Sequence, residues 1–331
     1  MNKLKVSVIT TFYNAEQFIL NAVNSVFVQL TDPNRDFEIE YVIVDDKSPD
    51  RSRELVERYI KSHQADHFIW KIVEPEVNLG CGGARKFGIE NATGDLFMFL
   101  DADDYYIHTD FIRRAVNDII TEGADVCEYG VIYNQPNGTS SNNTSPQKIV
   151  LTNPHDMEMC LFRDNLIKFN VWSKIYKRDI VERYEYSTVR TFEDVRTIPV
   201  WISNCKKVVI FPTAEINYRA ASNSIIRTNW VDTRLGTISA IAELFELFKD
   251  DYQLLKAMYV RAMIDLEAIL SNKSSECEGF NEMSKLNTHM LKYLYPDTWQ
   301  KITYHVETDP DINPQLKEEY IKTDLNSLPG M

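Results

Sequence analysis

The sequence lacks the features that mark small secreted, membrane-spanning or nucleic-acid-binding proteins. Its five cysteines are scattered and include no Cys-x-x-Cys pair, which argues against a disulfide framework and against a zinc knuckle. No uninterrupted apolar run approaches the roughly 20 residues that a membrane-spanning helix needs. Acidic residues outnumber basic ones by 49 to 36, and the net charge of −13 argues against a surface for nucleic acid. The N-terminal apolar stretch is too short for a signal peptide, so we expect a cytoplasmic protein.

Two common nucleotide-binding fingerprints are also missing. The glycine-rich stretch Asn78–Arg85 has Arg85 where the pattern Gly-x-Gly-x-x-Gly requires glycine, and no Gly-x-x-x-x-Gly-Lys-Ser/Thr loop exists. We predict that this stretch is a turn whose glycines let the backbone approach a ligand closely. Arg85 is then a charge partner for a phosphate or a carboxylate.

The 331 residues are of ordinary composition for a soluble globular protein, 44% hydrophobic and 26% charged, and their number suggests two domains. Apolar β-branched runs alternate with amphipathic segments of helical period, which predicts an α/β fold with a mostly parallel sheet. From about residue 230 the pattern is purely helical, so we expect a sheet domain at 1–229 and a helical region at 230–331. The predicted strands are Val6–Thr10, Ile39–Val44, Phe68–Val73, Leu96–Leu100, Val126–Tyr133 and Val208–Phe211.

Helix starts are predicted from capping residues. Asn14, with Gln17 three residues later, resembles a capping box for the first helix. Ser48 followed by Pro49 predicts the start of the second helix, and a third is expected at 84–92.

Polar groups cluster where the predicted strands end. Because the carboxyl ends of parallel strands meet at one edge of a sheet, we expect these groups to converge there. The sequence Asp101-Ala102-Asp103-Asp104 follows a strand that is apolar throughout, and such crowded carboxylates suit a hard divalent cation. Taken alone, the same aspartates are as often an acidic turn or a helix cap. The other groups are Thr11 with Tyr13, Asp45 with Asp46, and Gly80–Arg85.

A further acidic pair, Glu193-Asp194, opens a predicted helix about ninety residues beyond these aspartates. Acidic residues are favoured at a helix N-terminus by the helix dipole, so this pair also has a purely structural explanation.

Four segments, in order, resemble the GT-A glycosyltransferases of family 2. They are VSVITTFYNAEQFI, VIVDDKSPDRS, NLGCGGARKFGIENATGDLFMFLDADD and a later group made of NVWSKIYKRDIV, FEDV and YRAASNSIIR. Lys47 stands where the family usually has glycine, and Lys86 replaces a common asparagine. The resemblance covers about residues 4–227. It implies a GT-A fold with a nucleotide-binding half at 1–104 and an acceptor half at 105–229.

The resemblance also implies how a nucleotide-sugar is held. Thr11, Tyr13 and Asp46 would contact the nucleobase and its ribose, and Arg85 would line the same pocket. The aspartate cluster would bind the ribose through Asp101 and would hold Mn²⁺ or Mg²⁺ on the pyrophosphate through Asp103 and Asp104.

By the same resemblance, Asp194 is the general base, while Trp172 and Lys174 face the donor phosphates or the acceptor. A carboxylate that deprotonates the acceptor hydroxyl, opposite a leaving nucleoside diphosphate, gives inversion at the anomeric carbon. We therefore expect a metal-dependent inverting glycosyltransferase that uses a nucleotide-sugar, with UDP as the expected nucleotide.

The expected acceptor is a glycan or a lipid-linked glycan of a surface polysaccharide. The helical region could pack on the sheet domain, form a homodimer, or make peripheral contact with the inner face of the cell membrane. Two alternatives stay open: a catalytically silent glycan-binding or scaffold protein of the same fold, and a sugar nucleotidyltransferase. The nucleotidyltransferase is disfavoured because the segment after the first strand has no glycine to grip phosphate.

Overall fold

The computed structural model describes residues 3–31, 36–63, 69–135, 138–190 and 192–219, together with isolated residues between 237 and 261. Contacts divide the chain into two compact units: residues 1–161 with 165–222 form the first, and residues 162–164 with 223–331 form the second. The elements that position the site belong to the first unit. The predicted helical region 230–331 falls mostly outside the described residues and stays a prediction.

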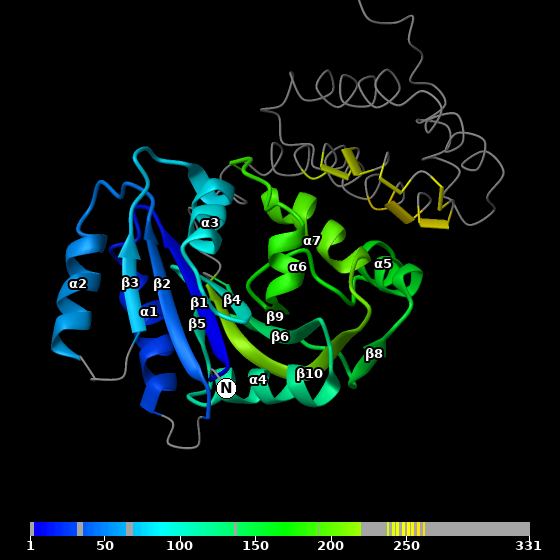
Figure 1. The fold of residues 1–331 in the computed structure, drawn as a ribbon, viewed down its shortest axis with the longest axis horizontal. Helices are drawn as coiled ribbons and strands as arrows, with labels where there is room; N and C mark the ends of the chain where they lie inside the picture. The colour runs from blue at the N-terminus through cyan, green and yellow to red at the C-terminus, as the bar shows by residue number, and fades with distance from the viewer. Residues whose placement is uncertain are drawn as a thin grey trace, which may run out of the picture. The chain divides into compact units, whose positions relative to one another are not determined.

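The first unit is built on one sheet (Figure 1). Among the described residues the sheet has ten strands, ordered β3-β2-β1-β4-β9-β6-β10-β5, with β7 on β6 and β8 on β10. The strands are β1 (Lys5–Phe12), β2 (Glu38–Asp45), β3 (Ile69–Val73), β4 (Leu96–Asp101), β5 (Tyr105–Tyr106), β6 (Val126–Asn134), β7 (Ser140–Asn143), β8 (Ile149–Leu151), β9 (Lys174–Lys177) and β10 (Val208–Arg219). The pairs β3·β2, β2·β1, β1·β4 and β6·β10 are parallel, while β9 runs antiparallel between β4 and β6.

Helices cover both faces of this sheet because its central strands are apolar on both sides. The helices are α1 (Ile19–Phe27), the short 3-10 helix η1 (Val28–Thr31), α2 (Ser52–Ser62), α3 (Gly80–Glu90), α4 (Phe111–Glu122), α5 (Pro154–Phe162), α6 (Arg178–Arg183) and α7 (Glu193–Ser203). On one face α1 packs against α2, and η1 contacts α4; on the other, α3 packs against β1, β2 and α7, and α6 contacts β4 and β9. In β4 every residue from Leu96 to Leu100 is buried, as its apolar run predicts.

The predicted helix starts are wrong in three places. Asn14 does not cap α1; it has a φ of 52°, and its N–H donates to Ser48 Oγ at 2.8 Å. Ser48 is therefore engaged with another loop, and α2 begins later, at Ser52. Helix α3 begins at Gly80, so the glycines predicted as a turn form its first turn. At Asn14 and at the start of α3 contacts with distant residues replace the expected local pattern, whereas at the start of α2 the Asp50 carboxylate accepts the hydrogen bond from Ser52 N at 3.0 Å.

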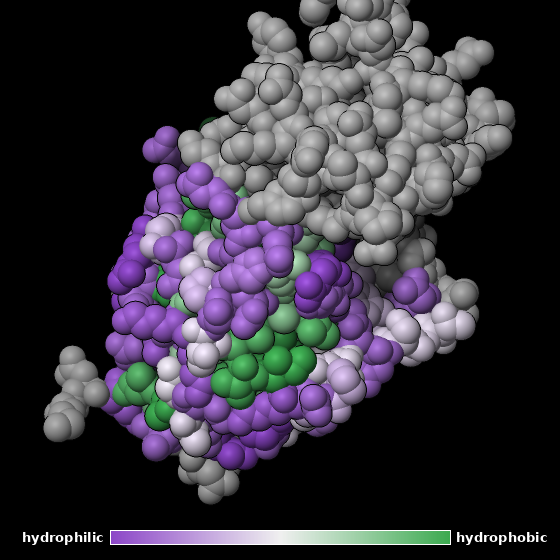
Figure 2. Space-filling model, turned by 90° about the vertical axis from the view of Figure 1, so that its right-hand side faces the viewer, coloured by the Kyte–Doolittle hydropathy of each residue, from purple (hydrophilic) through white to green (hydrophobic). Residues whose placement is uncertain are grey.

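Figure 2 shows one face of the molecule, on which hydrophobic residues gather in a patch bordered by hydrophilic ones. Large hydrophobic side chains that are exposed in the described residues include Ile120 and Val150. Single exposed hydrophobic side chains are normal on soluble proteins. None of the described helices has both the length and the hydropathy that crossing a membrane requires.

Candidate active site

The carboxyl ends of three parallel strands bring the predicted site residues together. In β1, Thr11 lies beside Val44 of β2 on one side and beside Asp101 of β4 on the other. Phe12 pairs with Asp45. The convergence predicted from the strand ends is thus present in the register of the sheet.

The aspartates after β4 are crowded and only partly neutralised. Burial, together with repulsion from Asp101, raises the pKa of Asp103 to about 6. Asp104 is fully buried, and burial with repulsion from Asp103 raises its pKa well above the ordinary value. Its Oδ1 accepts a hydrogen bond from Arg219 N at 2.9 Å. Its Oδ2 has no hydrogen-bond partner among the described residues.

A divalent cation fits this cluster. A buried carboxylate oxygen without a partner is costly. Burial and the neighbouring aspartates raise the pKa of Asp103 and Asp104, so their ionised forms are disfavoured until a positive charge compensates them. Oxygen ligands from Asp103 and Asp104 are those that Mg²⁺ and Mn²⁺ accept. The acidic-turn explanation leaves the unpaired oxygen unexplained.

Arg85 lies at the centre of an ionic network next to these aspartates. Its Nη2 donates to Asp101 Oδ1 at 2.6 Å, and its Nη1 donates to Glu193 Oε1 of α7. The Tyr186 hydroxyl lies 3.4 Å from Nη1. The side chains of Arg85 and Glu193 are 6% and 7% exposed, so this is a buried ion pair between α3 and α7. Arg85 was predicted to line the nucleotide pocket, but here its guanidinium is occupied by the protein's own carboxylates.

Asp46 is likewise engaged by the chain itself. Its two carboxylate oxygens accept hydrogen bonds from Leu79 N at 2.7 Å and Gly80 N at 2.9 Å, so it caps α3 from the end of β2. Burial raises the pKa of Asp46, and these two N–H groups oppose that effect. Each carboxylate oxygen can accept a second hydrogen bond, which leaves acceptor capacity for a nucleobase N–H. Tyr13, which is predicted to contact the nucleobase, is 54% exposed just beyond β1.

The glycines of α3 approach a segment of the chain, which corrects the prediction that they approach a ligand. A Cβ atom on Gly82 would lie 2.4 Å from the carbonyl oxygen of Ser187 and 2.5 Å from that of Val189. Gly80, at a φ of 74°, faces Arg190. Arg190 in turn donates to the side chain and the carbonyl of Asn78 at 2.9 and 3.0 Å. The segment 187–190 therefore lies directly on the start of α3.

Asp194 is half-buried in the first turn of α7. Burial, with repulsion from Glu193, raises the pKa of its carboxyl to about 7, and the Arg85 guanidinium opposes this shift. Asp101 adds to the repulsion, so the charges of the strand edge act on Asp194. A carboxyl group that titrates near neutrality is suited to accept a proton at physiological pH.

Trp172 and Lys174 lie in buried positions. The Trp172 ring is stacked on Tyr218 of β10, with ring centroids 5.5 Å apart. The Lys174 ammonium group is buried, donates to the carbonyl oxygens of Lys168 and Asn170 at 2.8 and 2.6 Å, and lies 3.5 Å from Glu128 Oε2. Burial lowers the pKa of Lys174, and Glu128 opposes this effect. In this arrangement both side chains are engaged by other groups of the chain. Their expected contact with the donor phosphates or the acceptor stays a prediction.

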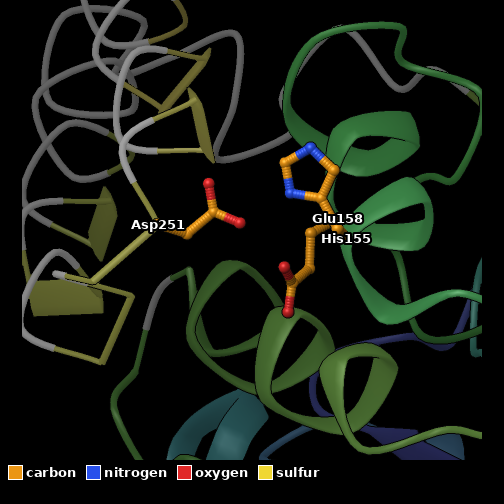
Figure 3. A group of neighbouring side chains, drawn as sticks. All are labelled: His155, Glu158 and Asp251. Carbon is orange, nitrogen blue, oxygen red and sulfur yellow. The ribbon is translucent and has the colours of Figure 1, made fainter.

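Figure 3 shows three other potential ligand side chains, His155, Glu158 and Asp251. His155 and Glu158 lie on α5 of the first unit. Asp251 belongs to the second unit, where its carboxylate accepts a hydrogen bond from Leu254 N at 2.9 Å. We assign no ion to side chains that come from different units.

The family model for glycosyl transferase family 2 matches residues 7–185, which is more than half of the chain. The chain belongs to glycosyl transferase family 2. Among curated relatives, EpsH of Bacillus subtilis, named as a glycosyltransferase, is 28% identical over 186 residues, covering 55% of this chain and 49% of EpsH. The poly(ribitol-phosphate) beta-glucosyltransferase of Bacillus spizizenii is 23% identical over 335 residues, covering 98% of this chain and 45% of that protein. The family 2 chain thus spans about half the length of these two relatives.

Solved structures establish the fold of this family 2 chain. The crystal structure of S. aureus TarS 1-349 has a TM-score of 0.60 and 19% identity, and the match covers 97% of this chain and 92% of that one. A mannosyltransferase from Pyrobaculum calidifontis, solved with GDP-Man and Mn²⁺, has a TM-score of 0.54 and 17% identity, covering 97% and 86%. The chain has the GT-A fold, as the sequence resemblance predicted.

Two residues of the site had no assigned role in the sequence analysis. Glu193 was named only as part of an acidic pair, yet it is the residue that binds Arg85. Arg219 ends β10, donates its backbone N–H to Asp104, and places its guanidinium 4.8 Å from the centroid of the Phe18 ring. Arg219 lies in the family-like segment YRAASNSIIR, which gives it no partner, because the residues that Glu193 and Arg219 contact lie more than a hundred residues away in the sequence.

Proposed function

We propose that this chain is a metal-dependent inverting glycosyltransferase that moves a sugar from a nucleotide-diphosphate sugar to a glycan acceptor. One observation carries the proposal: at the edge where β1, β2 and β4 end, a cluster of under-neutralised aspartates lies within electrostatic range of a half-buried carboxyl group whose pKa is raised to about 7. Cation ligands and a base are the two groups that such a transfer requires.

Asp103 and Asp104 would hold the cation, and Asp101 would contact the ribose of the donor. When bound, Mn²⁺ or Mg²⁺ supplies Lewis-acid stabilisation of the negative charge on the leaving diphosphate. The buried Oδ2 of Asp104 supports this assignment, since ligation would give it the partner that it lacks.

Asp194 would accept the proton of the acceptor hydroxyl as that oxygen attacks the anomeric carbon. The proton moves to the Asp194 carboxylate, the new glycosidic bond forms, and the bond between the sugar and the diphosphate breaks. Attack opposite the leaving group inverts the anomeric configuration. The raised pKa favours proton transfer, because a stronger base accepts the proton more readily while half of the groups remain ionised near pH 7.

Donor and acceptor are proposed from relatives. TarS 1-349 has been solved in complex with UDP and with UDP-GlcNAc, which supports a UDP-sugar as donor. Relatives named as poly(ribitol-phosphate) glycosyltransferases support a cell-surface polymer as acceptor. We also propose that the enzyme works in the cytoplasm, because the proposed donor is a nucleotide-sugar.

A binding and turnover screen tests this function. UDP-, GDP- and dTDP-sugars, each with Mn²⁺ and with EDTA, are compared by thermal shift and by release of nucleoside diphosphate in the presence of glycan acceptors. We expect a metal-dependent rise in Tm with one nucleotide class, since a ligand of the folded state stabilises it. We also expect release of the matching diphosphate. Binding of glycans with no diphosphate released from any donor would support the silent scaffold instead.

A further inference from the structure

The buried Arg85 network joins the two sides of the proposed reaction. Asp101 ends β4 on the donor side, Glu193 precedes the proposed base in α7, and one guanidinium binds both. Arginine is suited to this task because its rigid planar fork can donate to two carboxylates at once. A lysine ammonium at the same place could not reproduce that geometry.

The packing of α3 against the segment before α7 sets this contact. Gly82 and Arg85 lie three residues apart and therefore on the same side of α3. A Cβ atom on Gly82 would lie within 2.5 Å of two carbonyl oxygens of that segment and 3.0 Å from Glu193 Cβ. The absent side chain at Gly82 lets the segment approach, and this approach brings Glu193 to the guanidinium.

The backbone at the start of α7 is strained, which also indicates that its position is imposed by contacts. Phe192 has a φ of 60° and a ψ of 27°, a left-handed conformation that a bulky residue rarely adopts. Such strain persists only where the surrounding structure holds it. The buried Arg85–Glu193 pair is directly adjacent to this residue.

We propose that Arg85 and Glu193 are positioning residues, which fix the N-terminus of α7, and with it Asp194, against the donor-side Asp101. This inference rests on the proposed function, because it assumes that Asp194 is the base. It replaces the expected role of Arg85 as a donor ligand: both of its terminal nitrogens donate to protein carboxylates, and its side chain is 6% exposed.

The charges around Asp194 give this role a measurable signature. The groups that act on it or respond to it are Glu193 beside it in α7, Arg85 from α3, Asp101 from β4, Lys174 from β9 and Tyr186 from the preceding segment. Glu193 raises the pKa of Asp194 and Arg85 lowers it. On the acidic side of the pH profile, kcat falls as Asp194 becomes protonated. Replacing Glu193 or Arg85 by a neutral residue, one at a time, should therefore move this acidic limb in opposite directions.

The test compares Glu193→Gln, Arg85→Lys and Arg85→Gln with Glu215→Gln as a matched control. Glu215 is also buried, at 1% exposure, and pairs with Arg114 through two 2.6 Å contacts. The control thus removes the buried carboxylate of an Arg–Glu pair whose arginine is half-buried and which has no part in the site. The readouts are kcat and donor KM over a pH series at saturating metal, the Tm, and the rise in Tm caused by UDP with Mn²⁺.

We expect Glu193→Gln to lower kcat by roughly tenfold to a hundredfold, because small misplacements of a reacting group cost that much. Donor KM and the UDP-induced rise in Tm should stay near wild type. Its acidic limb should move to lower pH, and that of Arg85→Gln to higher pH, by roughly one unit each. Arg85→Lys should recover part of the kcat lost in Arg85→Gln, and Glu215→Gln should change only the Tm.

Several results would overturn the inference. Wild-type kcat in Glu193→Gln would show that the pair does not position the base. A raised donor KM with unchanged kcat in Arg85→Lys would return Arg85 to the role of a donor ligand. These outcomes are distinct from failure of the proposed function, which would appear as a wild-type protein that transfers no sugar and gains no stability from any nucleotide.

Discussion

Two regions near one edge of the sheet hold aspartates in opposite electrostatic states. Asp50, in the loop after β2, accepts hydrogen bonds from Ser48, from Ser52 and from the backbone N–H of Glu16. Burial alone would raise its pKa, but these donors lower it to about 2. In the cluster after β4 burial dominates instead, and the pKa of Asp103 is raised to about 6.

The two regions differ in how many hydrogen-bond donors the protein places around each carboxylate. Around Asp50 the protein provides a hydroxyl or N–H group for each carboxylate oxygen, so the ionised form is stable and the group organises two loops. Around Asp103, Asp104 and Asp194 it provides too few donors, and these carboxylates are left in need of a cation or a proton. Perturbed groups of the second kind are candidates for function, whereas those of the first kind serve structure.

The largest loss of activity should follow from replacing Asp194 by a neutral residue. Asp194→Asn removes the proton acceptor without changing the shape of the side chain, so we expect transfer to fall roughly 10²- to 10⁴-fold. Donor binding, measured by thermal shift with UDP and Mn²⁺, should be retained. Asp179→Asn is the control, because Asp179 stands in the first turn of α6 as Asp194 does in α7, but is exposed. Equal turnover in the two variants would mean that Asp194 is not the base.

Asp103 should show its role through the metal. Asp103→Asn removes a charged oxygen from the cluster, so the Mn²⁺ concentration for half-maximal activity should rise at least about tenfold. The measurement is a Mn²⁺ titration of turnover, with calorimetry of Mn²⁺ binding as a readout that does not depend on activity. An unchanged titration curve would remove Asp103 from the ligand set.

The pH dependence of turnover sharpens the same comparison. Asp194 must be ionised to accept a proton, and its pKa is about 7, so kcat should fall below about pH 7 and approach a tenfold loss per pH unit. The profile is measured at saturating donor and metal, with Glu215→Gln as the control. A flat profile down to about pH 5 would place the base elsewhere.

Sequence alone predicted the strand edge well, because β1, β2 and β4 are local apolar runs that end in polar residues. Thr11 at the end of β1 and Asp101 at the end of β4 are therefore paired across the two strands. The helix starts could not be predicted in the same way. The residue that caps α3 is Asp46, which lies 33 residues before Leu79, and no local pattern reports such a partner.

The contacts of Arg85 could not be predicted for a related reason. Its partner Glu193 is 108 residues away, and the close packing at Gly82 that joins them is a tertiary contact. A glycine-rich stretch next to an arginine fits a ligand-binding turn as well as it fits helix packing. Only the position of the segment 187–190 distinguishes the two explanations.

The smallest expected effect concerns Asp50, whose role is structural. Its pKa is lower in the folded state than the ordinary value of 3.8, so its stabilisation is present above about pH 4 and is lost as the pH falls towards about 2. Asp50→Asn should therefore destabilise the protein by about 1 kcal/mol at neutral pH, the typical net contribution of one hydrogen bond, because the asparagine NH₂ group cannot accept the bond that one carboxylate oxygen accepts. The difference from wild type should shrink between about pH 5 and pH 2, because the wild-type carboxylate becomes protonated there.

Urea unfolding across this pH range measures the difference in free energy of unfolding, with the exposed Asp179→Asn as the reference. A destabilisation by Asp50→Asn that stays constant with pH would show that hydrogen bonding to the side chain, and not its charge, holds the two loops together.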